Sequence, residues 1–233
     1  MNFIPGQESL KQGSYKYFDL ITGLFVAVLL ISNIASSKIV DIWKFTFDGG
    51  TILFPLSYIF GDILTEVYGY RRSRRVIWIG FFCALMMSFT LGIIGLIKPA
   101  GGWDYQEAYM AILGQTPRIV TASLIAYFAG EFSNSYILAK MKVLTRGKFL
   151  FARTIGSTII GQGIDTIIFV IIAFLGVYDN SMVLLIIISN YIFKVSLEIL
   201  FTPITYKVVN TLKKAEKVDW FDYKTNFNPF VFS

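Results

Sequence analysis

Apolar residues are gathered into six long windows, separated by short polar or glycine-containing segments. A helix needs about 20 mostly apolar residues to cross the hydrocarbon core of a bilayer, and each window is near that length. The third contains no charged residue, whereas Pro55, Asp62 and Glu66 interrupt the second, which favours a broken or tilted helix there. The pattern predicts an all-α integral membrane protein with six transmembrane helices. The windows are residues 17–37, 51–69, 76–97, 118–139, 154–177 and 182–206.

Composition supports lipid as the main solvent of the chain. Of the 233 residues, 55% are hydrophobic and 15% are charged, with a mean hydropathy of +0.62. In a soluble domain, roughly a quarter of all residues are charged. The chain has no histidine, which excludes Ser-His triads and His-ligated metals. Its single cysteine, Cys83, cannot form an internal disulfide or a cysteine-rich metal site. We therefore expect no cofactor and no metal.

The 21 Lys and Arg residues outnumber the 15 Asp and Glu residues, which gives a formal charge of +6. The cations gather in alternate connections, where basic residues mark the cytoplasmic side. A nucleic-acid binder would place them in a stripe on a folded surface, so no nucleic-acid partner is expected. The sequence predicts one domain over residues 1–233, both termini in the cytoplasm, and a short cytoplasmic tail at 212–233. The basic connections are Arg71, Arg72, Arg74 and Arg75; Lys140, Lys142, Arg146, Lys148 and Arg153; and Lys207, Lys213, Lys214, Lys217 and Lys224.

Four of the windows each carry a stripe of polar side chains at helical spacing. An ionisable residue at the centre of a membrane helix costs roughly 2.5 to 3.5 kcal/mol, so such residues usually face a cavity or a partner. The stripes therefore predict a polar chamber at membrane depth, enclosed by apolar outer faces. Its expected members are Asp62 and Glu66 in the second window, Glu131 and Asn134 in the fourth, Gln162 and Asp165 in the fifth, and Asn190, Lys194 and Glu198 in the sixth.

Five carboxylates in these stripes face one clear cation, Lys194, with Arg118 as a second candidate. An excess of acceptors suits a ligand rich in N–H donors or one that carries a positive charge. Two alternatives stay open. Lys194 and Glu198 can form an ion pair within their own helix, and Asn134 and Asn190 can hold helices together by hydrogen bonds.

The residues of the chain do not fit several classes of membrane enzyme. Gly161-Gln162-Gly163-Ile164-Asp165 is similar to the G-x-G-D signature of intramembrane aspartyl proteases, but one residue too many turns the carboxylate by about 100° around the helix. Intramembrane metalloproteases and rhomboid-type proteases need histidine. The sequence also lacks the G-x-x-x-x-G-K-[ST] phosphate loop of an ATPase. Transport without a built-in ATPase remains, and the chain is not expected to be an enzyme.

A set of motifs follows one another along the chain in a specific order. They are SNIASSK at 32–38, FPLSYIFGDILTEVYGY at 54–70, RRVIW at 74–78, RIVTAS at 118–123, GEFSNS at 130–135, Ser157-Thr158, Gly161-Gln162, Asp165-Thr166, YIFK at 191–194 and Pro203. Taken in this order, they resemble the queuosine-precursor transporter family of bacterial membrane proteins. The resemblance implies uptake of 7-deazaguanine bases, namely the 7-cyano and 7-aminomethyl precursors or queuine, across the cytoplasmic (inner) membrane. It also implies a six-helix bundle similar to the S components of energy-coupling-factor vitamin transporters. The alternative is an S component that needs a separate ATPase module.

A deazaguanine fits the predicted chamber, because its ring N–H and exocyclic amine lie along one edge that a carboxylate can accept side by side. Asp62 and Asp165 are the leading candidates for that edge, followed by Glu66 or Glu131. Aromatic side chains can stack on the flat ring, although each can equally serve helix packing. The preferred precursor, proton coupling, a homodimer and an energising partner stay open. The remaining candidates are Asn134, Gln162 and Asn190 for the other ring groups, Lys194 or Arg118 for the carbonyl, and Tyr58, Phe169, Tyr191 and Phe193 for stacking.

Overall fold

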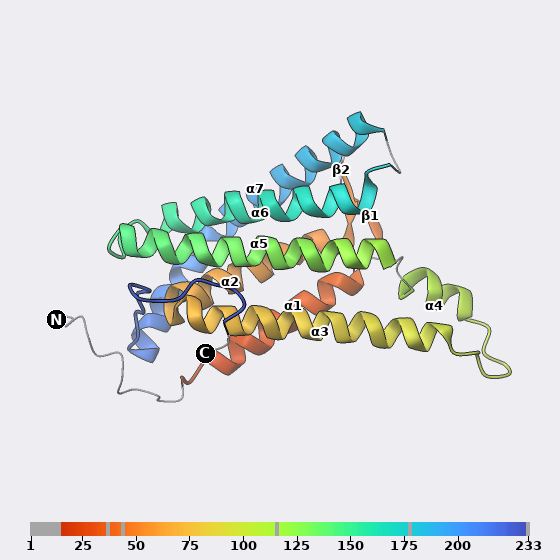
Figure 1. The fold of residues 1–233 in the computed structure, drawn as a ribbon, viewed down its shortest axis with the longest axis horizontal. Coiled ribbons are helices and arrows are strands. Elements are labelled where there is room, and N and C mark those ends of the chain that lie inside the picture. The colour runs from red at the N-terminus through yellow and green to blue at the C-terminus, as the bar shows by residue number, and fades with distance from the viewer. Residues whose placement is uncertain (1–14, 36–37, 43–44, 115–116, 177–178, 232–233) are drawn as a thin grey trace.

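The chain folds into a bundle of long helices with a small β-hairpin at one end (Figure 1). The computed structural model describes residues 15–35, 38–42, 45–114, 117–176 and 179–231. The helices are α1 (Phe18–Ala35), η1 (Gly49–Ile52), α2 (Phe54–Tyr68), α3 (Tyr70–Leu96), α4 (Gln106–Ile112), α5 (Pro117–Leu144), α6 (Leu150–Phe174) and α7 (Asn180–Glu216), and the strands are β1 (Ile39–Ile42) and β2 (Phe45–Asp48).

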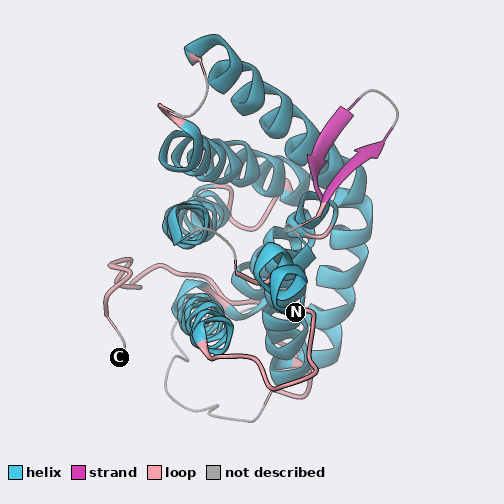
Figure 2. Ribbon diagram, turned by 90° about the vertical axis from the view of Figure 1, so that its right-hand side faces the viewer, coloured by secondary structure: helices cyan, strands magenta, loops and turns pink. Residues whose placement is uncertain are grey.

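The connections at the hairpin end are more structured than the sequence predicts. Strands β1 and β2 pair antiparallel, with Ile39 opposite Asp48 and Ile42 opposite Phe45, and Figure 2 shows them projecting beside the helices. The short helix α4 lies in the connection between α3 and α5. Only β2, with the sequence FTFD, alternates apolar and polar residues, and β1 reads IVDI. Strands this short give little signal beside six strong helical windows.

Five helical stretches among the described residues are long and apolar enough to cross a membrane, which makes the chain a multi-pass membrane protein. Helix α5, with 28 residues, is also long enough but is more polar, since it carries Glu131 and Asn134. Helix α7 has 37 residues, or about 55 Å of helix, and therefore extends well beyond a 30 Å hydrocarbon core. The five stretches are Phe18–Ala35, Gly49–Tyr68, Tyr70–Leu96, Leu150–Ala173 and Val183–Glu216.

Helix α2 lies at the centre of the bundle, in contact with α1, α3, α5 and α7. Almost all of its side chains are buried, including Asp62 and Glu66. Because charged groups are costly in lipid, the helix that interrupts its apolar pattern is the one shielded by the others. Gly69 ends α2 at a φ of +86° and lets the chain turn directly into α3. Glycine adopts that conformation at no steric cost.

Helices α5 and α6 lie side by side over most of their length (Figure 1). They approach most closely where Gly130 faces Gly161. A Cβ atom on Gly161 would lie 2.7 Å from Cβ of Asn134, and one on Gly130 would lie 2.7 Å from Cβ of Asp165. Small residues at a helix crossing let the backbones come together. This contact brings the polar stripes of α5 and α6 into the same region.

The start of α1 and the end of α7 meet at the end of the bundle opposite the hairpin. The backbone N–H of Tyr17 and the hydroxyl of Tyr68 both donate to Oε1 of Glu216, at 2.7 and 3.0 Å. The turns between α2 and α3 and between α5 and α6 lie at this same end (Figure 1), together with the basic connections. We call it the basic end.

Beyond α7 the chain folds back along the bundle. The backbone N–H of Tyr70 donates to Asp222 at 3.0 Å, Nη1 of Arg74 donates to the carbonyl of Asn228 at 2.7 Å, and Nε1 of Trp78 donates to the carbonyl of Pro229 at 2.8 Å. The predicted tail at 212–233 is therefore helical up to Glu216 and is then packed against the start of α3 up to residue 231.

Candidate functional site

The structure divides the predicted polar residues into two buried clusters. The first, which we call the chamber cluster, lies between α2, α5, α6 and α7. Its members are Tyr58 and Asp62 on α2, Glu131 and Asn134 on α5, Thr158, Gln162, Asp165 and Thr166 on α6, and Lys194 and Glu198 on α7, all of them buried. The second, the basic-end cluster, is made by Glu66, Lys142, Arg153, Lys213 and Asp219.

Three polar contacts connect the helices of the chamber cluster. Nδ2 of Asn134 donates to Oδ1 of Asp62 at 2.7 Å and joins α5 to α2. Nζ of Lys194 lies 2.8 Å from Oδ2 of Asp165 and joins α7 to α6. The hydroxyl of Thr158 donates to Oε1 of Glu198, also between α6 and α7. Lys194 is thus paired across helices with Asp165, and not with Glu198 on its own helix.

Many polar atoms of the chamber cluster are buried without a hydrogen-bond partner. More than 90% of buried polar groups in proteins are normally paired, so a concentration of exceptions in one place indicates a site that a ligand or water completes. Carboxylate and carbonyl oxygens predominate among them, which favours a ligand rich in N–H donors. The atoms are Oδ2 of Asp62, both carboxylate oxygens of Glu131, Oδ1 of Asn134, both amide atoms of Gln162, Oε2 of Glu198, and the hydroxyls of Tyr58 and Thr166.

Aromatic rings border the cluster on the α2 side. The ring centroids of Phe54 and Tyr58 lie 6.0 Å apart, and Nζ of Lys194 lies 4.9 Å from the centroid of Phe54. Phe54 was not among the sequence candidates. The signal that points to it is its position one helical turn before Tyr58 on α2.

Other sequence candidates are less buried than the cluster or lie outside the described side chains. The Tyr191 hydroxyl donates to the backbone carbonyl of Ile159 at 3.1 Å, which directs it along the surface of α6. Asn190 and Phe169 are half-buried on α7 and α6. For Arg118 only the helical backbone at the start of α5 is described. Their predicted contacts with a ligand remain predictions.

Glu66 belongs to the basic-end cluster. Its Oε1 lies 2.7 Å from Nη2 of Arg153, 2.5 Å from Nζ of Lys213 and 3.5 Å from Nζ of Lys142. Asp219, in the segment after α7, lies 2.6 Å from Lys142 and 2.9 Å from Lys213. Lys142 and Arg153 are fully buried, so these cations neutralise Glu66. The geometry favours a structural role for Glu66.

We predict that acid weakens the attachment of the segment after α7 through Asp219. Burial opposes ionisation of this carboxyl, but the ammonium groups of Lys142 and Lys213 outweigh it and hold the pKa of Asp219 below its ordinary value of 3.8. A lowered folded-state pKa contributes stability that is present above pH 3.8 and is lost as the pH falls through the folded value. Limited proteolysis of the purified protein between pH 6 and 3 is expected to show faster cleavage after α7 on acidification. Asp219→Asn is expected to cleave fast throughout, with a flatter pH profile, and an unchanged wild-type profile would contradict the assignment.

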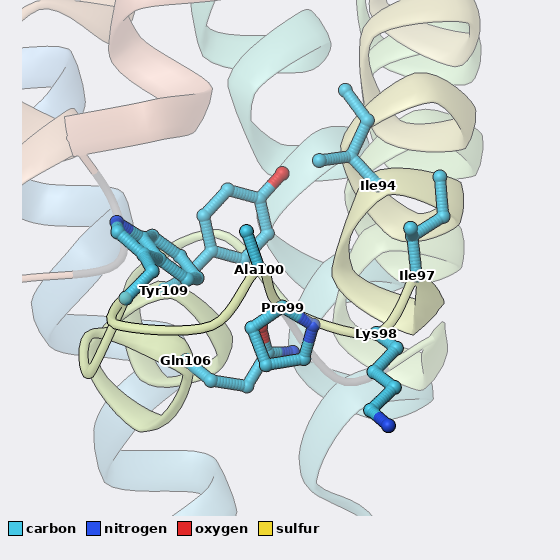
Figure 3. A pocket seen from close by; sticks show the side chains of 8 residues that line it. Ile94, Ile97, Lys98, Pro99, Ala100, Gln106 and Tyr109 are labelled. Atoms are coloured by element: carbon cyan, nitrogen blue, oxygen red, sulfur yellow. The ribbon is translucent and has the colours of Figure 1, made fainter.

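The open pockets lie outside the chamber cluster. One of about 300 Å³ lies between the end of α3 and α4 (Figure 3). Its polar side chains are satisfied by backbone, since Gln106 donates to the carbonyl of Gly95 at 2.7 Å and Tyr109 donates to that of Leu91 at 3.1 Å. Another, of about 280 Å³, lies towards the hairpin end and is lined by residues of α1, α3 and α5, including Thr121 and Leu124. The residues of the chamber cluster are buried from solvent in this conformation.

Known proteins of similar sequence are membrane transporters. The chain is 29% identical over 207 residues to a probable queuosine precursor transporter of Bacillus subtilis (strain 168), which covers 87% of this chain and 90% of that protein. It is 28% identical over 204 residues to the queuosine precursor transporter of Escherichia coli (strain K12), covering 86% and 90%. Because these relatives are transporters, the chain is a transporter and not an enzyme. No solved structure matches the chain significantly. The family model described as putative vitamin uptake transporter matches residues 48–208, a range that includes the whole chamber cluster, and the chain belongs to that family.

Proposed function

We propose that this protein imports queuosine precursors, the 7-deazaguanine bases, and that it binds them in the chamber cluster. The relatives that carry this name match almost the whole chain. The observation that carries the proposal is the set of unpartnered buried oxygen and amide atoms contributed by four helices. A site of this kind, between helices at the midplane, is typical of secondary transporters.

The chemistry of the base matches the free atoms of the cluster. The edge of a deazaguanine that carries the ring N–H and the exocyclic amine presents two donors, and Asp62 and Glu198 each keep an unpartnered oxygen for them. The amide of Gln162 can donate to the ring carbonyl or accept from the pyrrole N–H, two groups on opposite sides of the base. The rings of Phe54 and Tyr58 lie beside the cluster and offer stacking surfaces.

The proposed arrangement in the membrane has six spans, with the basic end in the cytoplasm. Helix α5 is the sixth span, because its polar residues face Asp62 and Gly161 inside the bundle and not lipid. The excess of Lys and Arg at the basic end supports the cytoplasmic orientation, and a bacterial inner membrane is the compartment of such a transporter. Lys98→Cys and Lys148→Cys variants, labelled with a thiol reagent from each side of the membrane, test the orientation.

Uptake by the protein alone tests the proposed function. A strain unable to make or otherwise import 7-deazaguanines is expected to regain queuosine in its tRNA when it expresses the wild-type chain. Vesicles that contain only the purified chain are expected to exchange external radiolabelled 7-cyano-7-deazaguanine for unlabelled base inside. If cells regain queuosine but the vesicles exchange nothing, the chain is a binding subunit of the S-component kind that needs a partner. If both fail while the protein inserts normally, the substrate assignment is wrong.

Asp62→Asn is expected to weaken uptake roughly 10- to 100-fold. A hydrogen bond to a charged group contributes about 1.5–3 kcal/mol, which the neutral amide does not supply. The variant should still fold, because the new side-chain oxygen can accept the bond from Nδ2 of Asn134. Asp179→Asn, at the start of α7 and outside the cluster, is the matched control and should transport normally. The initial uptake rates of the two variants are compared at equal amounts of protein in the membrane. Equal rates would show that Asp62 does not contribute to binding of the base.

A further inference from the structure

Glu131 differs from the other carboxylates of the chamber cluster. Asp62 accepts a hydrogen bond from Asn134, Asp165 is paired with Lys194, and Glu198 accepts one from Thr158. Both oxygens of Glu131 are buried without a partner, and its side chain is fully inaccessible to solvent. An ionised carboxylate left in this condition at membrane depth costs far more than a neutral one.

The position of Glu131 is set by the contact between α5 and α2. A Cβ atom on Gly61 would overlap the Glu131 carboxylate, so the carboxyl group rests directly on the α2 backbone. Its surroundings are acidic or neutral, and the one cation described in the cluster, Lys194, is already paired with Asp165. The titratable and charged groups facing it are Tyr58 and Asp62 from α2, Tyr127 from its own helix, Asp165 from α6 and Glu198 from α7.

We propose that Glu131 carries the proton of a proton-coupled import cycle, in which one proton enters the cell with each molecule of base. The inference rests on the proposed function and adds the coupling ion to it. In the closed conformation described here the carboxyl group is protonated. Loss of the proton to the cytoplasm leaves a charge on Glu131 among Asp62, Asp165 and Glu198, and that repulsion drives α5 and α2 apart when the base leaves.

A route for the proton lies along one face of α5. Leu124, Tyr127 and Glu131 follow each other at helical spacings of three and four. Leu124 lines the 280 Å³ pocket towards the hairpin end. The Tyr127 hydroxyl, on the turn of α5 between Leu124 and Glu131, is buried without a hydrogen-bond partner. A hydroxyl both accepts and donates a hydrogen bond, so Tyr127 can relay a proton from water in the pocket to the carboxylate.

Two transport modes in the same vesicles test the proposal. Exchange of labelled for unlabelled 7-cyano-7-deazaguanine at equal pH needs no net proton movement, whereas accumulation driven by an acidic exterior does. With the membrane potential clamped by potassium and valinomycin, one pH unit supports up to about tenfold accumulation for one proton per base. Wild type is expected to do both, and a proton-conducting uncoupler is expected to abolish only the accumulation. Glu131→Gln, which resembles the protonated side chain, is expected to accumulate nothing, and its accumulation is compared with its own rate of exchange in the same vesicles. Glu107→Gln, on exposed α4, is the matched control and should accumulate normally.

The outcomes separate this inference from the proposed function. Wild-type vesicles that exchange base but neither accumulate it across a pH gradient nor take up protons when base is added overturn the role of Glu131 and leave the substrate assignment standing. Full accumulation by Glu131→Gln also overturns it. Vesicles without any exchange refute the proposed function, and the coupling with it. Because proton uptake is measured on wild type with an internal pH dye, the test does not depend on whether the variant folds.

Discussion

Glu66→Gln is expected to destabilise the protein by about 3–5 kcal/mol, the cost of breaking a buried ion pair by removing one partner. Oε1 of Glu66 meets Arg153, Lys213 and Lys142 at once. Without its charge, three cations remain at the basic end with Asp219 alone to neutralise them. The amide oxygen of glutamine can take the place of Oε1, because Oε2 of Glu66 has no hydrogen-bond partner, so the expected loss comes from the missing negative charge. Thermal unfolding of the purified protein in detergent measures the effect.

The same substitution at Glu107, which lies exposed on α4, is the control and should leave the midpoint within the experimental error of wild type. Glu66→Gln/Lys213→Gln removes one of the uncompensated cations and is expected to regain part of the lost stability. A stable Glu66→Gln variant that fails to exchange 7-cyano-7-deazaguanine would instead place Glu66 in the binding site, as the sequence alone suggested.

The chamber could largely be predicted from the sequence, because membrane helices leave polar residues few places to lie. The polar stripes on four windows predict seven of its members, namely Asp62, Glu131, Asn134, Gln162, Asp165, Lys194 and Glu198. The grouping of Asp62 with Glu66 did not hold. Their spacing of four places them on one face, as predicted, but one helical turn also separates them by about 6 Å along the axis. Their partners place them in different clusters, because Asp62 bonds to Asn134 whereas Glu66 is paired with the cations of the basic end.

The partners of Glu66 could not be read from hydropathy. Lys142 and Arg153 lie just outside the predicted windows, and Lys213 lies beyond the sixth, so the sequence assigned all three to cytoplasmic connections. Helices α5, α6 and α7 extend past the apolar windows and bring these cations back onto α2. The packing of the segment after α7 was equally hidden. It is held in part by the backbone carbonyls of Asn226, Asn228 and Pro229, which every residue has and no pattern reveals.

The partner of Lys194 was left open by the sequence, and the structure pairs it with Asp165. The in-helix alternative, Glu198, accepts instead from Thr158. Lys-before-Glu is the weaker order for a pair four residues apart on one helix. The 2.8 Å contact to Asp165 also joins α6 to α7, so it contributes to the packing of two helices as well as to the charge of the chamber.

A double-mutant cycle is expected to separate the structural role of this pair from its role in the site. Lys194→Met alone leaves Asp165 buried without its cation and should cost about 3–5 kcal/mol. Asp165→Asn/Lys194→Met removes both charges and should recover most of that loss, because the two effects are coupled. Thermal unfolding of the four proteins gives the coupling energy, and Lys98→Met, at an exposed position, controls for loss of a lysine as such. Additive losses would show that the contact adds nothing to stability.

Transport by the double variant then reports on the ligand. The recovered fold no longer has the ammonium group that lies between Asp165 and the Phe54 ring, which is the described cation best placed to donate to the carbonyl of a deazaguanine. Exchange of 7-cyano-7-deazaguanine is therefore expected to stay at least about tenfold below wild type, the value of one charge-assisted hydrogen bond. A stable double variant that exchanges at the wild-type rate would make the Lys194–Asp165 pair purely structural, and would leave binding of the base to Asp62, Gln162 and Glu198.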